Sequence, residues 1–126
     1  MPAMYDDAQV LLRCAELYQA MNLGEISGWV YSDDFPTEYT AFVADYPQGS
    51  ERYAELMRYA GYYETVATLW KHKLFDEDLL LDWMLVPWRS VSGVLLGIRE
   101  TIGVLRMWEN FEALGAAQDR WEADRS

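Results

Sequence analysis

The single histidine of the sequence, His72, is the first residue to consider for metal binding or acid–base catalysis. A histidine near the end of a helix is usually a solvated surface residue. Lys71 and Lys73 flank His72, and their positive charges oppose the binding of a cation. We therefore predict that His72 lies on the surface and holds no metal.

Two glutamates, Glu109 and Glu112, have the Glu-x-x-Glu spacing with which some helical enzymes hold Mg²⁺. Such a site needs a second carboxylate pair on a facing helix. The other acidic pairs of the sequence have the spacing of a solvated face or of a helix cap, and no Glu-x-x-His motif is present. We predict that Glu109 and Glu112 are solvated and that the chain binds no metal or other cofactor.

The single cysteine, Cys14, falls on the apolar stripe of a predicted helix, where a thiol is ordinarily an inert core residue. The sequence also lacks a glycine-rich phosphate loop with a following lysine, a Gly-x-Ser-x-Gly elbow and a dinucleotide-binding fingerprint. These observations predict a chain that is not an enzyme and has no catalytic residue.

Two charged residues, Glu64 and Arg99, stand alone between strongly apolar stretches. A buried charge is tolerated when it is paired and hydrogen-bonded, so a guanidinium on Glu64 or on Glu112 would determine how the helices align. The alternative is that both are surface charges whose apolar stems lie along the helices. The sequence leaves these two readings open.

The apolar residues recur with helical spacing, which predicts an all-α fold: a compact bundle of five or six helices without a sheet. Ser50 is predicted to open a helix, Asp76 to cap the next one, and residues 25–35 to form a loop. A chain of 126 residues suits one helical domain, 1–126. The predicted helices span about 7–21, 36–45, 50–73, 76–87, 88–99 and 101–123. The predicted core comprises Leu56, Tyr63, Trp70, Leu80, Trp83, Leu95, Trp108 and Phe111, with Leu105 on the buried side of the last helix.

Three small residues, Ser90, Gly93 and Gly97, share one face of a predicted helix. Glycine in a helix interior costs roughly 1 kcal/mol relative to alanine, and the close approach of a second helix would offset that cost. This face predicts a close helix crossing, either within the chain or between the two copies of a homodimer.

The charge balance is strongly acidic, with a net charge of −11, of which −7 lies in residues 1–50. Such a chain is a poor ligand for a nucleic-acid backbone, whereas its charge leaves a basic protein partner open. The candidate binding surface comprises Asp6, Asp7, Glu25, Asp33, Asp34 and Glu38. Since no run of 18 apolar residues and no signal peptide is evident, we predict a cytoplasmic protein without a membrane segment.

Three blocks of sequence resemble an uncharacterised prokaryotic all-helical family known only as a domain of unknown function. The blocks are Tyr63-Glu64 with Leu69 and Leu74-Phe75-Asp76, then Trp88 leading to Arg99, then Trp108-Glu109-Asn110-Phe111-Glu112 with Leu114. The resemblance extends over about residues 53–121. It implies a helical fold and supplies no reaction and no catalytic residue.

Six tryptophans, nine tyrosines and four phenylalanines exceed what a minimal helical core requires. Tyrosine and tryptophan anchor protein interfaces at a small entropic cost. Our first hypothesis is therefore a non-enzymatic interaction or scaffolding module that binds another protein through an aromatic and acidic surface. The second is an acidic mimic of nucleic acid that inhibits a basic partner. Binding of a small molecule in a helical pocket stays open.

Overall fold

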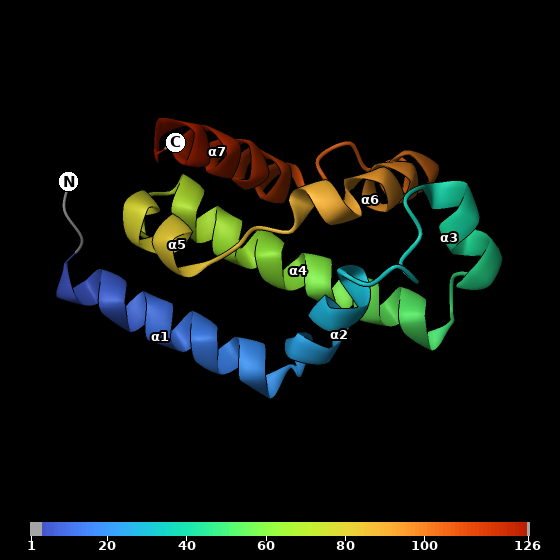
Figure 1. The fold of residues 1–126 in the computed structure, drawn as a ribbon, viewed down its shortest axis with the longest axis horizontal. Helices are drawn as coiled ribbons and strands as arrows, with labels where there is room; N and C mark the ends of the chain where they lie inside the picture. The colour runs from blue at the N-terminus through green and yellow to red at the C-terminus, as the bar shows by residue number, and fades with distance from the viewer. Residues whose placement is uncertain (1–3, 126) are drawn as a thin grey trace.

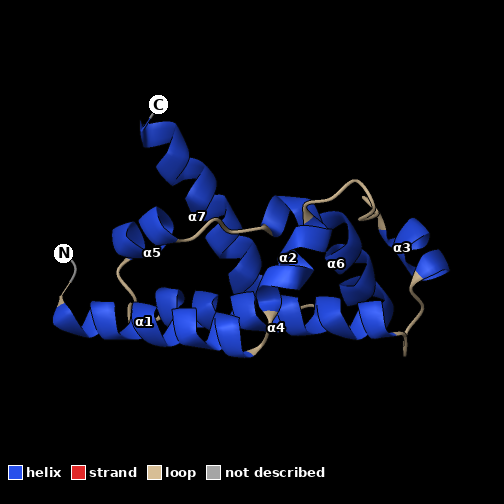
Figure 2. Ribbon diagram, turned by 60° about the horizontal axis from the view of Figure 1, so that its bottom comes forward, coloured by secondary structure: helices blue, strands red, loops and turns tan. Residues whose placement is uncertain are grey.

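The computed structural model describes residues 4–125, and within that range the chain forms helices and no strand (Figures 1 and 2). The prediction of an all-helical bundle is confirmed. Residues 1–3 and 126, the ends of the predicted domain, lie outside the described residues. In chain order the helices are α1 (Tyr5–Ala20), α2 (Leu23–Val30), α3 (Tyr39–Asp45), α4 (Glu51–Lys71), α5 (Glu77–Trp83), α6 (Trp88–Ile102) and α7 (Glu109–Arg125).

Helix α4 is the centre of the structure and lies between α7 and α1 in Figure 1. Ser50 caps it as predicted, since its Oγ accepts the N–H of Tyr53 at 3.3 Å. The buried residues of α4 are Leu56, Tyr59, Ala60, Tyr62, Tyr63, Val66 and Ala67. Because this set is wider than one narrow stripe, neighbouring elements cover α4 on more than one side.

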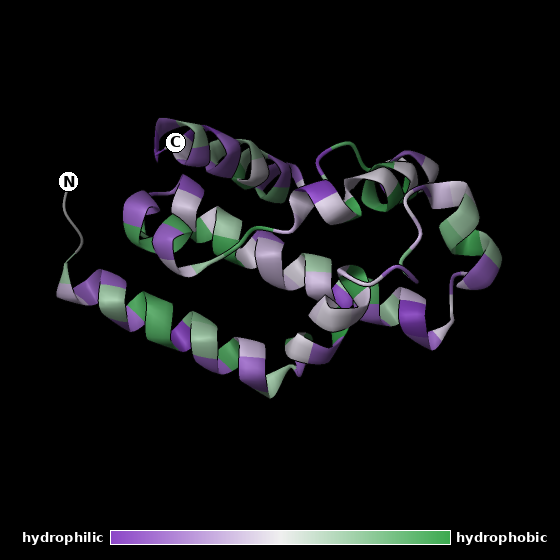
Figure 3. Ribbon diagram, in the orientation of Figure 1, coloured by the Kyte–Doolittle hydropathy of each residue, from purple (hydrophilic) through white to green (hydrophobic). Residues whose placement is uncertain are grey.

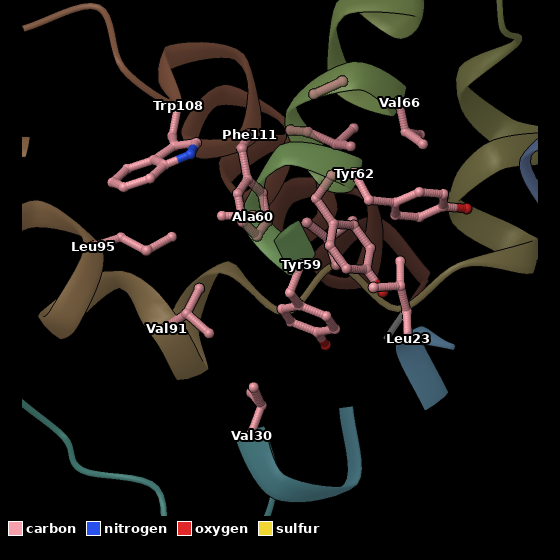
Figure 4. Close-up of a cluster of buried hydrophobic side chains, with 14 of the residues drawn as sticks. Leu23, Val30, Tyr59, Ala60, Tyr62, Val66, Val91, Leu95, Trp108 and Phe111 are labelled. Carbon is pink, nitrogen blue, oxygen red and sulfur yellow. The ribbon is translucent and has the colours of Figure 1, made fainter. Parts of the chain in front are cut away.

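The buried core joins α4 to α6 and α7, and Figure 4 shows Leu95 and Phe111 directed toward the side of α4 that carries Ala60. Six of the eight predicted core residues are buried: Leu56, Tyr63, Leu80, Leu95, Trp108 and Phe111. Trp70 is partly buried. The prediction for Trp83 is wrong, because this residue ends the short helix α5, stacks on Phe75 at the edge of the core and stays 36% exposed.

Residues 23–30 form helix α2, so the predicted loop over 25–35 is wrong in its first half and the described helices number seven. Asn22 takes the left-handed conformation, with φ at 55°, and turns the chain between α1 and α2. Gly24 and Gly28 weaken the local tendency to form a helix. The burial of Leu23, Ile26, Trp29 and Val30 outweighs that cost, because tertiary packing supplies most of a helix's stability.

The last helix begins at Glu109, although the sequence predicts a start near Thr101. Gly103 takes the left-handed conformation, with φ at 84°, and ends α6 at Ile102. Leu105 therefore lies in the turn between α6 and α7 and is 80% exposed, which contradicts its predicted burial. In Figure 3, part of this turn is coloured green, for hydrophobic.

The glycines of α6 make a close contact with residues of the same chain. A Cβ added at Gly93 would lie 2.1 Å from the backbone oxygen of Thr37, and one at Gly97 would lie 2.2 Å from Cβ of Tyr39. The predicted close crossing is thus formed within the chain, by α3 and the residues just before it. A homodimer stays a prediction, but its proposed face of Ser90, Gly93 and Gly97 is already occupied at the two glycines.

Among residues 4–125, no single helix has both the length and the apolar composition to cross a membrane. Helices α5 and α6 meet those criteria only as a pair, and the pair is bent by 101° at its break.

Candidate functional site

Glu64 on α4 caps the N-terminus of α7. One carboxylate oxygen accepts the backbone N–H of Phe111 at 2.9 Å, and the other accepts the side-chain amide of Asn110 at 2.9 Å. Thr68 adds its hydroxyl to this cluster, 3.2 Å from the amide nitrogen of Asn110. The first N–H groups of a helix lack partners within the helix, so a carboxylate placed here satisfies a donor and favours the positive end of the helix dipole.

Arg99 on α6 holds the turn that precedes α7. Its Nε donates to the carbonyl of Met107 at 2.7 Å, and its Nη1 donates to the carboxylate of Glu112 at 3.0 Å. The Arg99 side chain is 13% exposed, whereas the Glu112 side chain is 46% exposed. The Nη2 of Arg99 is buried without a hydrogen-bond partner. Arg99 therefore forms its ion pair with Glu112 and not with Glu64. Glu64 and Arg99 nevertheless bind the same segment, residues 107–112.

The candidate metal ligands either form ion pairs with arginines or lie apart from one another. Glu112 pairs with Arg99, and Glu109 pairs with Arg106 at 3.3 Å. His72 is exposed at the end of α4. Within residues 4–125, no group of three or more His, Cys, Asp or Glu side chains is arranged to hold a metal ion.

Cys14 is the one described residue of α1 that is fully buried, and burial raises the pKa of its thiol. Its backbone carbonyl accepts the hydroxyl of Tyr62 at 2.7 Å, which ties α1 to α4. A protonated, buried thiol is a poor nucleophile, as the apolar position of Cys14 in the sequence predicts.

The acidic residues chosen as a binding surface do not form one patch. Asp7 is structural, because its two oxygens accept the backbone N–H groups of Met4 at 2.8 Å and Asp76 at 3.0 Å. Glu25 accepts the side-chain amide of Asn22 at 2.7 Å. Helix α1 starts at one end of the long axis in Figure 1 and α3 lies at the other. The remaining candidates, all exposed, are Asp6 at the start of α1 and Asp33, Asp34 and Glu38 between α2 and α3.

An open groove of about 390 Å³ lies among α1, α2, α4 and the end of α5. We call it the tyrosine groove. It is lined by Ala15, Tyr18, Gln19, Ser27, Tyr31, Tyr62, Tyr63, Trp83, Met84 and Leu85. No carboxylate, imidazole, thiol or ammonium group is among these side chains, so the groove is a neutral aromatic surface with hydroxyl and amide groups at defined points.

Burial raises the pKa of Tyr31, Tyr62 and Tyr63, so their hydroxyls remain protonated at neutral pH. At the rim, apolar side chains face solvent: Tyr31 is 50% exposed and Leu85 is 62% exposed. Exposed apolar side chains around a concave surface are typical of a binding site.

The groove was not predicted from the sequence. The excess of aromatic residues indicates a contact surface, yet it does not say which tyrosines meet. Tyr31 follows the helix α2, which the sequence analysis assigns to a loop, and Tyr18 and Tyr62 lie on helices whose mutual placement depends on tertiary contacts. A direct signal would have been the helical spacing of the apolar residues Leu23, Ile26, Trp29 and Val30.

A family model described as a domain of unknown function (DUF4760) matches residues 18–121. The chain belongs to this family. The match begins before the resemblance seen at 53–121 and contains α2 to α6, most of α7 and the end of α1. No match of significance was found among curated proteins or among solved structures.

The three sequence blocks that carry the resemblance described in the sequence analysis have a structural explanation. Glu64, Arg99 and the segment 108–112 are the partners that fasten the start of α7 to α4 and α6. The tyrosine groove lies partly outside the matched range, because Ala15 precedes residue 18. These blocks thus belong to the frame of the fold, and Tyr63 of the first block also lines the tyrosine groove.

Proposed function

We propose that the chain is a non-enzymatic interaction module that binds an apolar side chain of a partner protein in the tyrosine groove. The observation that carries this proposal is the groove itself: a concave, neutral, aromatic surface with exposed apolar residues at its rim. Interfaces are enriched in tyrosine and tryptophan, which contribute large contact areas with few rotatable bonds.

The charge of the chain favours a basic partner, because a net charge of −11 attracts cationic surfaces and raises the rate of their association. Mimicry of nucleic acid is the less favoured proposal, since the six acidic candidates are divided among the start of α1, α2 and the segment before α3. The start of α1 and α3 lie at opposite ends of the long axis (Figure 1). A mimic needs a continuous row of carboxylates with the spacing of phosphates.

Site-specific photo-crosslinking tests the proposal. A benzophenone amino acid at Tyr31, at the rim of the groove, should crosslink one defined protein in native cells, identified by mass spectrometry. The same group at Tyr5, which is 77% exposed on α1 and does not line the groove, is the matched control. Ala15→Trp fills the groove and should abolish the crosslink from Tyr31 while circular dichroism stays unchanged.

Two results would contradict the proposal. One is the same crosslinks from Tyr31 as from Tyr5, and the other is a Tyr31 crosslink that survives Ala15→Trp. A crosslink that disappears steeply as salt rises would favour the mimic instead, because charge–charge attraction is screened and aromatic contact is not.

A further inference from the structure

The segment Met84–Val86 joins α5 to α6 as an extended stretch of chain (Figure 2). Met84 and Leu85 line the tyrosine groove. Met84 has φ at −114° and ψ at 134°, which are strand values. The buried side chain of Gln118 pairs with one edge of this segment: its Oε1 accepts the N–H of Val86 at 2.8 Å and its Nε2 donates to the carbonyl of Met84 at 3.3 Å. This edge is therefore satisfied from within the fold.

Leu85 lies between these two residues and belongs to the opposite edge. In an extended chain the backbone N–H and C=O of successive residues point to opposite sides. Within residues 4–125, neither the N–H nor the C=O of Leu85 is hydrogen-bonded to another residue. Its side chain lines the tyrosine groove and is 62% exposed. Leu85 thus presents one unpaired backbone donor and one acceptor beside an apolar groove.

A second hollow, of about 290 Å³, continues past Leu85. Tyr31 and Leu85 line both hollows, and we call the two neighbouring hollows together the track. The second hollow is also lined by Asp119 and Glu122 and by one base, Arg89, which is already paired with Asp119 at 3.0 Å. The track therefore has a neutral aromatic end and an end that is lined by charged side chains.

We propose that the occupant of this track is an extended segment of a basic partner protein. The segment pairs its backbone with the N–H and C=O of Leu85 and places one apolar side chain in the tyrosine groove. The net charge of −11 favours lysine or arginine in the rest of the segment. Addition of an extended chain to an exposed strand edge is an established mode of peptide recognition. The inference rests on the proposed function and names the partner's conformation and charge.

An extended segment fits these observations better than a helix does. The backbone groups of a helix are already bonded within the helix and leave none for the N–H and C=O of Leu85. An unpaired donor and acceptor that become covered by an apolar ligand lose water without compensation, which weakens binding. An extended chain replaces the lost water at both groups.

The experiment selects random 12-residue peptides displayed on phage against the full chain and measures the affinity of the enriched peptides by fluorescence anisotropy. Leu85→Pro removes the N–H, and the φ and ψ of Met84 are values favoured before proline. Because that N–H has no partner among residues 4–125, its loss removes no hydrogen bond of the described fold. Leu85→Val keeps the N–H and is the matched control.

We expect the enriched peptides to combine an apolar residue with lysine or arginine. Leu85→Pro should weaken their binding about tenfold or more, and Leu85→Val by less than about threefold. In the wild-type chain, the Leu85 amide should become protected from hydrogen exchange when the peptide binds. This exchange measurement tests the backbone pairing at Leu85 even if Leu85→Pro fails to fold.

Equal binding to the wild type and to Leu85→Pro, an unprotected Leu85 amide, an absence of basic residues or a selection without enrichment would each overturn the inference. The Ala15→Trp variant distinguishes a failure of the extended pairing from a failure of the proposed function. Peptides that ignore Leu85→Pro but are lost in Ala15→Trp would leave the groove as the binding site and contradict only the extended pairing. Peptides that also bind Ala15→Trp unchanged would contradict both.

Discussion

The carboxylate of Glu64 on α4 accepts the backbone N–H of Phe111 in the first turn of α7 at 2.9 Å, across 47 positions of sequence. The residue before α7, Trp108, has an indole that donates hydrogen bonds and accepts none, so it cannot cap the helix. Helix α7 therefore obtains its cap from α4, and the same contact fixes α7 on the centre of the bundle.

Replacing Glu64 with alanine should lower the free energy of unfolding by about 1–3 kcal/mol, because the N–H of Phe111 loses its acceptor in a partly buried place. The matched control is Arg106→Ala, which removes the exposed pair with Glu109 and should change stability by less than about 0.5 kcal/mol. Urea denaturation measures both. Equal midpoints for Glu64→Ala and the wild type would show that the cap is not needed.

Arg99 and Glu112 should contribute unequally although they form one ion pair. Arg99→Ala removes the donor to the carbonyl of Met107 and the packing of a side chain that is 13% exposed, so we expect a loss of about 2 kcal/mol or more. Glu112→Gln keeps an oxygen acceptor at a half-exposed position and should cost less than about 1 kcal/mol. Chemical denaturation that finds equal losses would contradict this assignment.

Trp108 combines burial with an unusual backbone. It is 6% exposed and has φ at 61°, in the left-handed region that disfavours side chains. Trp108→Ala should cost about 3–5 kcal/mol through lost packing. Trp108→Gly should be more stable than Trp108→Ala by about 1 kcal/mol, because glycine adopts this conformation without strain. Thermal melting of the two variants in the reverse order would contradict that reasoning.

Gly97→Ala should destabilise the chain, because the new Cβ would lie 2.2 Å from Cβ of Tyr39, at the base of a side chain that cannot swing away. Gly61→Ala on α4 is the matched control: nothing lies within 4 Å of its added Cβ, and alanine should stabilise the helix by up to about 1 kcal/mol. Circular dichroism gives the melting temperatures. Light scattering on Gly97→Ala should show no loss of a dimer, since Tyr39 belongs to the same chain.

Stability should fall as pH rises above about 9 to 10. Burial raises the pKa of Tyr59, Tyr62 and Tyr63 above the ordinary value of 10.0, and that of Cys14 above 9.0. Their folded-state pKa is raised, so the unfolded chain loses these protons first and alkaline pH favours unfolding. Each such group adds about 1.4 kcal/mol per pH unit to the slope.

The control for this pH dependence is Tyr59→Phe, which should reduce the alkaline slope by about one proton, although it also removes the 3.0 Å hydrogen bond between Tyr59 and Ser27. Urea titrations between pH 8 and pH 11 provide the slope. A free energy of unfolding that stays constant over that range would mean that the three hydroxyls ionise freely in the folded state.

The caps and the periodicity of α4 and α5 were readable from the sequence because they depend on neighbours within one or two turns. Ser50 accepts the N–H of Tyr53, and Asp76 accepts the N–H of Leu79, as their positions predict. The small residues Gly93 and Gly97 likewise indicated a close crossing, since their cost within a helix demands a compensating contact. These local signals were enough for the all-helical fold and for most of its core.

The tertiary structure alone decided which distant groups meet. Residues 23–30 are helical because burial of Leu23 and Trp29 outweighs two glycines, and such a gain is absent from local propensity. The partner of Arg99 is Glu112 and not Glu64, because the left-handed turns at Gly103 and Trp108 reverse the chain between them. The tyrosine groove is lined by residues of α1, α2, α4 and the segment around the end of α5, which come together only in the folded chain. Side chains that meet only after the chain has reversed direction leave no periodic signal in the sequence, so their contacts could be found only in the folded molecule.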